Sequence, residues 1–371
     1  MVVAGVILLC AAADAQTVTV DARQVAAQSG DPGQLQRIVW ETHVAAGQNE
    51  VMAVYVVGPR GGTTVGARSI GFALRTGLSG VPSWTEGLIP DDSAGNPITG
   101  PGGIQFPATS PDKNLYVAHF LQLRPNQPPG RLRFAVGKDA VDPDDAKVEF
   151  FRIKDPNDVP VKLTLNHPIV NNPPDPPLAP GTFRIPTIPE IAIDPDDANS
   201  MYLVYSDTAT SSPSDKDMNI YFHKLTKQDS SGVVWTLGPR IGPINDDSSA
   251  FESDQVMPTI TVANGRIHVV WYDDRKYNET SNQADGAANP KYDVFYASST
   301  DAVTFSSNEE LFANPSETAL DLSLTTTLSE MGDYIGVSAF GDTVYALYTG
   351  TKQNAPGDDS VIYSTRIEHG Q

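Results

Sequence analysis

The chain has 371 residues, of which 40% are apolar and 19% charged, and its formal net charge is −20. This length is sufficient for a large core in one β domain or in two ordinary domains. Because so much negative charge would repel a phosphate backbone, we expect no nucleic-acid partner.

An apolar run at the start of the chain has the composition of an export signal. Residues Val2–Ala13 are almost wholly apolar, and Ala13-Asp14-Ala15 places small residues where a signal peptidase cuts. The run is too short to span a bilayer as a mature helix. We therefore expect a signal peptide over 1–15, a single domain over 16–371, and a secreted or periplasmic protein. Once the leader is removed, no membrane insertion is expected.

The one cysteine, Cys10, lies within this leader. It follows Leu9, whereas a lipoprotein site would have a small residue there, so we expect no lipid anchor. The mature chain would have no disulfide, and its stability must therefore come from packing.

Short apolar runs that are separated by turn residues begin after the leader. Arg37–Ala45, Val51–Val57 and Ser69–Leu74 have the β-branched and aromatic composition of strands, and Gly47–Asn49 is typical of a turn. A further short stretch, Ser79–Trp84, completes a unit of four strands.

The same pattern of a polar turn followed by an apolar strand recurs along the chain, which indicates a repeat architecture. The strands that follow such turns are Leu115–Phe120, Met201–Asp207, Arg266–Tyr272 and Thr343–Tyr348. Further strands follow after polar loops at Asn219–Leu225, Asp293–Ser298 and Ser360–Arg366. Because no long segment has a period of 3.6 residues, we expect an all-β fold with little helix.

One repeat leaves the number of units open. Asp142–Ala146 duplicates the turn at Asp194–Ala198, and Lys147–Ile153 follows it as a strand. If this strand opens its own unit there are six units, and if it supplies the outer strands of the second unit there are five. We expect six, with five as the alternative. The proline-rich stretch Pro173–Pro180 is then a stiff linker between units.

Several motifs resemble those of the bacterial sialidase-like, or BNR-repeat, β-propellers. Ser299–Phe305 resembles the Asp-box of that family, Ser-x-Asp-x-Gly-x-Thr-Trp, although it is one residue short and lacks the glycine. The other motifs that carry the resemblance are Ser79–Trp84, Gly232–Trp235, Val270–Arg275 and Gly332–Gly336. The resemblance extends over roughly 37–367 and implies a β-propeller whose blades are the repeated units. Asp-boxes in this family lie on the blade rim, so they indicate a fold rather than an enzyme.

A propeller must close its ring, because an open blade edge would present unpaired backbone groups to other chains. The last unit ends at Arg366 without room for a fourth strand, and Thr17–Val20 alternates as a strand would. We therefore expect Thr17–Asp21 to supply the missing outer strand.

The stretch Phe183–Pro186 reproduces the Phe-Arg-Ile-Pro motif of sialidases. The resemblance implies that Arg184 binds a substrate carboxylate, a task suited to the planar fork of a guanidinium group. A chance match before a structural proline is the alternative. The family also needs two more arginines, an acid/base aspartate and a tyrosine nucleophile. The candidates for these roles are Arg275 and Arg366, then Asp274 or Asp333, and finally Tyr334 or Tyr363. Each of them is also compatible with a structural role.

The sequence offers little for a metal or a cofactor. The six histidines are scattered and form no zinc motif. Calcium is conceivable because oxygen ligands on loops suit a hard cation. The candidate ligands are Asp142, Asp144, Asp194 and Asp196, although Asp-Pro-Asp-Asp is also an ordinary turn sequence.

Three functions are compatible with these features. The first is an exported sialidase-like propeller that binds glycans or cell-surface proteins through loops on one face. The second is an exo-sialidase that acts on terminal sialic acids. The third is a structural protein of a cell surface or an extracellular assembly. A propeller scaffold alone does not choose among them.

Overall fold

The computed structural model describes the backbone of the following residues: 18–26, 37–46, 50–59, 69–76, 85–88, 108–109, 115–121, 131–138, 147–150, 152–159, 161, 163, 165–166, 189–212, 215, 217–229, 234–247, 253–278, 291–312, 320–321, 335–351 and 360–369. Within these ranges, side chains are described for most residues from Ile153 onward.

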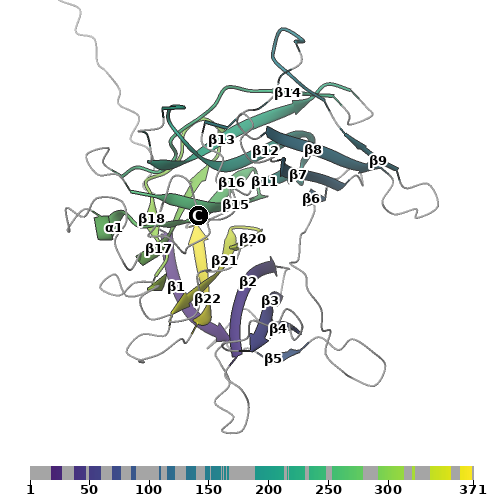
Figure 1. Ribbon diagram of the computed structural model, residues 1–371. Helices are drawn as coiled ribbons and strands as arrows, with labels where there is room; N and C mark the ends of the chain where they lie inside the picture. The colour runs from purple at the N-terminus through teal and green to yellow at the C-terminus, as the bar shows by residue number, and fades with distance from the viewer. Residues whose placement is uncertain are drawn as a thin grey trace, which may run out of the picture.

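The strands in the described part of the chain form five sheets (Figure 1). The first contains β2 (Arg37–Ala46), β3 (Glu50–Pro59), β4 (Ser69–Thr76) and β5 (Thr85–Leu88). The second contains β6 (Ala108–Thr109), β7 (Leu115–Leu121), β8 (Arg131–Lys138) and β9 (Lys147–Phe150). Each strand pairs antiparallel with the next, so each of these sheets is a simple meander.

Each of the other three sheets combines an antiparallel meander with one further strand. The third contains β11 (Glu190–Asp194), β12 (Asp197–Thr208), β13 (Met218–Lys227), β14 (Val234–Leu237) and β10 (Arg152–Lys154). The fourth contains β15 (Gln255–Ala263), β16 (Arg266–Asp273), β17 (Lys291–Ser299) and β18 (Glu309–Glu310), with β19 (Leu320–Asp321) also paired to β17. The fifth contains β20 (Gly336–Phe340), β21 (Thr343–Thr351), β22 (Ser360–His369) and β1 (Val18–Ala26).

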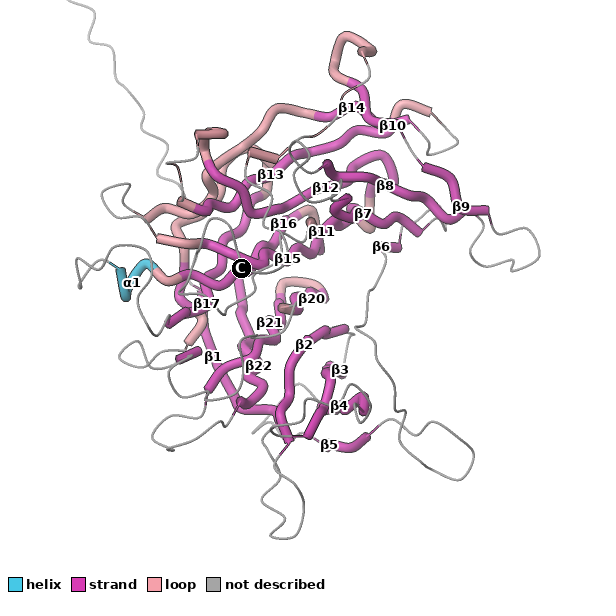
Figure 2. Tube along the Cα trace, viewed as in Figure 1, coloured by secondary structure: helices cyan, strands magenta, loops and turns pink. Residues whose placement is uncertain are grey.

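The sheets lie around a common centre like the blades of a propeller, and Figure 2 shows this arrangement from the same side. Their first strands face the centre: β2 contacts β20, β20 contacts β15, β15 contacts β11, and β11 contacts β6. The all-β expectation is confirmed, because the helix in the described residues is limited to one turn, α1 (Arg275–Asn278). None of the described helix is long and apolar enough to cross a bilayer.

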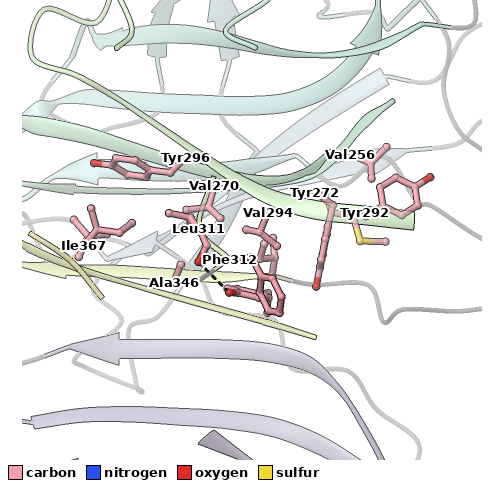
Figure 3. Close-up of a cluster of buried hydrophobic side chains, with 14 of the residues drawn as sticks. Val256, Val270, Tyr272, Tyr292, Val294, Tyr296, Leu311, Phe312, Ala346 and Ile367 are labelled. Atoms are coloured by element: carbon pink, nitrogen blue, oxygen red, sulfur yellow. Dashed lines mark hydrogen bonds between the residues drawn. The ribbon is translucent and has the colours of Figure 1, made fainter. Parts of the chain in front are cut away.

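The core consists of layers of side chains between neighbouring sheets. Strand β16 is buried on both faces: Val269 and Trp271 pack toward the third sheet, whereas Val270 and Tyr272 pack toward the fifth. Figure 3 shows the second of these layers. This double burial explains why such strands are continuously apolar instead of alternating. Full burial of a side chain such as Val270 contributes roughly 1.5–3 kcal/mol.

The predicted strand Lys147–Ile153 is divided between two sheets. Its first part is β9, which pairs antiparallel with β8 at the outer edge of the second sheet. Its end enters β10, which pairs parallel with β14 of the third sheet. The expected strand therefore opens no sheet of its own in the described residues.

Strand β1 lies on the outer edge of the fifth sheet. It pairs antiparallel with β22, and the register places Val18 opposite His369 and Asp21 opposite Arg366. A segment from the start of the described chain thus completes a sheet whose other strands come from its end.

Candidate functional site

Among the described residues, most of the buried carboxyl groups lie at one edge of the sheets. In a meander, the start of the first strand, the end of the second and the start of the third lie together. Accordingly Gln255 pairs with Asp273, which in turn pairs with Asp293. We call this the acidic edge. Its carboxyl groups are those of Glu190, Asp207, Asp254, Asp273, Asp274 and Asp293, and all of these residues except Glu190 are buried.

Glu190 opens β11, the first strand of the third sheet, and remains partly exposed. Burial of its carboxyl group raises the pKa to about 8, because a low-dielectric environment disfavours the charged form. At neutral pH this carboxyl group is therefore mostly protonated and can donate a hydrogen bond or a proton. Glu190 was not among the candidate residues that the sequence motifs indicated. The available signal was a single carboxylate beside the apolar run Ile191–Ile193.

Asp254 and Asp274 hold each other in place at the start of β15. The Asp254 amide donates to Asp274 Oδ1 at 2.6 Å, and the Asp274 amide donates to the Asp254 carbonyl at 3.3 Å. Asp254 Oδ1 also accepts a hydrogen bond from the Met218 amide, at 3.3 Å. Because Met218 belongs to β13, this carboxylate lies at the junction of the third and fourth sheets.

Strand β15 is irregular just beyond this pair. Its register shifts between Val256 and Thr259, and Met257 has a φ of 51°. A non-glycine residue in this region is strained by about 1–3 kcal/mol, and such strain collects at functional sites. Bulges also redirect the side chains beside them. The irregularity is thus consistent with a binding site at the start of β15.

The sequence suggested Arg275 as a residue that binds a substrate carboxylate. In the structure its guanidinium group forms hydrogen bonds with other side chains of the protein. Its Nε and Nη2 atoms donate to Asp273 Oδ2 at 3.0 and 2.7 Å, and Nη1 donates to Asp246 at 2.7 Å. Nη2 also donates to Asn308 at 2.9 Å. The guanidinium carbon lies 4.2 Å from the ring centroid of Phe295. Burial raises the pKa of Asp273, and the bonds from Arg275 oppose that effect.

Lys276, the second residue of the short helix α1, forms ion pairs with two carboxylates. Its Nζ lies 3.2 Å from Asp293 Oδ2 and also contacts the carboxylate of Glu310. Burial raises the pKa of Glu310, and Lys276 opposes the effect. Together with Arg275, this ion pair fastens α1 onto the acidic edge.

The structure does not bring the candidate arginines Arg275 and Arg366 together. Arg366 pairs in register with Tyr345 near the start of β21, at the edge opposite the acidic edge, and it forms an ion pair with Glu368. Tyr363 is partly buried and packs edge-on against Phe312, with ring centroids 5.2 Å apart. The other candidates, Arg184, Asp333 and Tyr334, lie outside the described residues.

The calcium candidates that can be placed form a turn. Asp194 Oδ1 accepts a hydrogen bond from the Asp196 amide at 2.9 Å, as in an ordinary turn. Asp142 and Asp144 lie outside the described residues. Across the part of the chain that the structure describes, no group of three His, Cys, Asp or Glu residues is arranged to hold a metal ion.

Comparison with known proteins found no matching family model and no matching curated protein. Several solved structures are similar at low identity. One is described as a glycoside hydrolase, with 13% identity, a TM-score of 0.43, and coverage of 92% of this chain and 90% of that one. Another is the α-L-arabinanase of Penicillium chrysogenum complexed with arabinobiose, with 11% identity, a TM-score of 0.38, and coverage of 94% and 98%. A third is the sialidase of Trypanosoma rangeli in complex with the inhibitor DANA, with 10% identity, a TM-score of 0.32, and coverage of 94% and 59%.

Proposed function

We propose that this protein is a glycan-recognising β-propeller of the glycoside hydrolase type, with its site at the acidic edge and Glu190 as the general acid. The observation that carries the proposal is the placement of Glu190. It is a carboxyl group at the start of a centre-facing strand, where burial raises its pKa to about 8. Such a group can protonate the leaving oxygen of a glycosidic bond.

Glycoside hydrolysis also needs a second carboxyl group, which stays ionised and acts as base or nucleophile. Asp254 is our candidate. It immediately precedes β15, the centre-facing strand that packs against β11. Its position is fixed by the bonds with Asp274 and Met218, so its carboxylate would need little reorganisation during the reaction.

In this account Arg275 and Lys276 support the site without touching the glycan. Each is bound to an aspartate that is completely buried, Asp273 and Asp293 respectively. These ion pairs neutralise charge that would otherwise repel an ionised catalytic carboxylate. They also hold the helical turn α1 in place beside the site.

We further propose a five-bladed propeller over 16–371, closed by β1, which is exported through a leader at 1–15. The division of Lys147–Ile153 between β9 and β10 favours five blades over six. The pairing of β1 with β22 supports closure at the fifth sheet.

A second candidate is an exo-sialidase, which the Phe183–Pro186 motif favours. The motif ends three residues before β11, and Arg184 is six positions before Glu190 in the sequence. An arginine there would select a glycan whose terminal sugar carries a carboxylate. The separation of Arg275 from Arg366 leaves the rest of a sialidase arginine cluster without support.

The test is a panel of fluorogenic glycosides, including sialosides, assayed with the wild type and with Glu190→Gln. We expect turnover of at least one sugar class and a loss of at least about 100-fold in the variant, as for removal of a general acid. Glu309→Gln, on an exposed residue of β18, is the matched control and should be fully active. Binding without turnover would instead support recognition without chemistry. Neither binding nor turnover would contradict the proposal and leave a structural protein as the remaining function.

A further inference from the structure

Two buried histidines and one tyrosine join three strands at the edge opposite the acidic edge. His268 of β16 and His369 of β22 both bind the hydroxyl of Tyr296 on β17. The hydroxyl lies 2.7 Å from His268 Nδ1 and 2.6 Å from His369 Nε2. The two imidazole centroids are 5.4 Å apart. Tyr296 is labelled in Figure 3, and it comes from the fourth sheet, whereas His369 belongs to the fifth.

The hydrogen bonds of this cluster require both imidazole rings to be neutral. A tyrosine hydroxyl has one proton, so it donates to one imidazole nitrogen and accepts from the N–H of the other. Both bonds therefore form when both rings are neutral. The remaining ring nitrogens, His268 Nε2 and His369 Nδ1, are buried and have no hydrogen-bond partner among the described residues. On the ring that donates to Tyr296, a second proton would go to the outer nitrogen, where it finds no acceptor among the described residues. On the ring that accepts from Tyr296, a second proton would go to the accepting nitrogen and break that bond.

The surroundings also disfavour charge on the rings. Burial, together with the neighbouring His369 and Arg266, lowers the pKa of His268 to about 3. Burial and Arg266 also lower the pKa of His369, whereas Asp342 raises it. Arg266 lies on β16, and Asp342 lies in the turn between β20 and β21, where its carbonyl accepts the His369 amide at 3.2 Å. Of Arg266, His369 and Asp342, only Asp342 favours the protonated form of an imidazole ring, that of His369.

We propose that His268, Tyr296 and His369 form an acid-sensitive lock that fastens β22 to the fourth sheet and opens when the histidines are protonated. Because Val18 of β1 pairs opposite His369, opening would also loosen the pairing of β1 with β22. An acidic compartment or medium would therefore open the propeller at this junction before the rest of the molecule unfolds.

The direction of the effect follows from proton linkage. The rings have an ordinary pKa of 6.5 when exposed and a lower one when the lock is closed. The open state consequently binds more protons as the pH falls below 6.5, and the closed state is lost. His268 favours opening by up to roughly tenfold for each pH unit below 6.5. His369 acts in the same direction.

Hydrogen exchange of the full chain, followed by mass spectrometry and corrected for the intrinsic rate, tests the lock. Between about pH 7 and pH 5 we expect the protection of 362–369 to fall by roughly tenfold to a hundredfold. Protection of β12 and β13 should change much less. The third sheet contains a matched control, His223, whose ring binds the Tyr205 hydroxyl at 3.1 Å and the Gly238 carbonyl at 3.0 Å. Both of its nitrogens are thus engaged within one sheet. Burial lowers the pKa of this ring as well, but its bond to the Gly238 carbonyl opposes that effect, so acid should loosen β13 less than it loosens the lock.

Two substitutions remove the titrating groups and retain the bonds to Tyr296. An asparagine amide can replace Nδ1, and a glutamine amide can replace Nε2, so the variant is His268→Asn with His369→Gln. Its protection over 362–369 should be independent of pH, whereas His223→Gln should behave as the wild type does. The proposal is overturned if wild-type protection at 362–369 does not fall, or falls in parallel with β12 and β13. If the double variant does not fold, this comparison within the wild type decides alone.

Discussion

The Tyr272 hydroxyl on β16 donates a hydrogen bond to the carbonyl of Thr349 on β21 at 3.0 Å and accepts one from its amide at 2.9 Å. A side chain of the fourth sheet thereby satisfies both main-chain groups of a residue in the fifth. Tyr348 makes a similar link, because its hydroxyl lies 2.9 Å from Thr365 Oγ1 and 3.3 Å from the Leu311 carbonyl. The junction between these sheets is therefore specified by directional bonds within an apolar layer.

Tyr272→Phe should destabilise the protein by about 2 kcal/mol, because it leaves a buried carbonyl and a buried amide of Thr349 without their partner. Urea denaturation measures this loss. The control is Thr349→Val, which keeps both main-chain groups and the side-chain volume, and its effect should be clearly smaller. Equal losses in the two variants would mean that apolar packing alone holds this junction.

Arg275→Met should cost about 3 kcal/mol, because it leaves the buried carboxylate of Asp273 without its cation. Arg275→Lys keeps the charge but loses the fork that binds Asp273 and Asn308, so an intermediate loss is expected. Chemical denaturation measures both. If Arg275→Met retained wild-type stability but lost glycan binding, the arginine would contact the ligand rather than support the site.

Asp301→Ala should destabilise the turn after β17 by about 1 kcal/mol. The Asp301 carboxylate accepts bonds from the Val303 and Thr304 amides, at 2.8 and 2.7 Å, and from Ser299 Oγ at 3.0 Å. Led by the Thr304 amide, these bonds lower the pKa of Asp301 to about 2. Its contribution is therefore present above the ordinary value of 3.8 and is lost as the pH falls toward 2. Thermal unfolding of wild type and variant should converge in that acidic range, and a constant gap would contradict this explanation.

Glu190→Gln should stabilise the protein at alkaline pH, although the proposed function predicts that it loses catalytic activity. The folded pKa of about 8 lies above the unfolded value of 4.5, so the folded state binds more protons between these values. Wild-type stability therefore falls as the pH rises through this window, whereas the glutamine variant is insensitive. Near pH 8 the variant should be more stable, by on the order of 2 kcal/mol. A melting-temperature series over pH measures the difference, and a destabilised variant at pH 8 would contradict it.

The sequence predicted the strands that are buried on both faces. Arg266–Tyr272 corresponds to β16 and Asp293–Ser298 to β17, because unbroken apolar runs of this length have few alternatives to a covered sheet. Lys147–Ile153 was not predictable in the same way. Its end pairs with β14, and a three-residue contact between segments so far apart leaves no local pattern.

The candidate site shows the same limit. Arg275 was recognisable as part of a charged cluster, but its partners Asp246 and Asn308 are 29 and 33 residues away in the sequence. Glu190 was not recognisable as a proton donor, because its pKa depends on burial that neighbouring sheets create. The sequence thus shows which residues can carry charge. Their partners and their pKa values depend on how the folded chain packs around them.

The most direct test of the account is the pH dependence of glycoside turnover in the wild type. If Glu190 is the general acid, the turnover number should fall as the pH rises through about 8, and Glu190→Gln should remove this alkaline limb together with the activity. A turnover number that stays constant through this range, or that survives in Glu190→Gln, would contradict a catalytic site at the acidic edge.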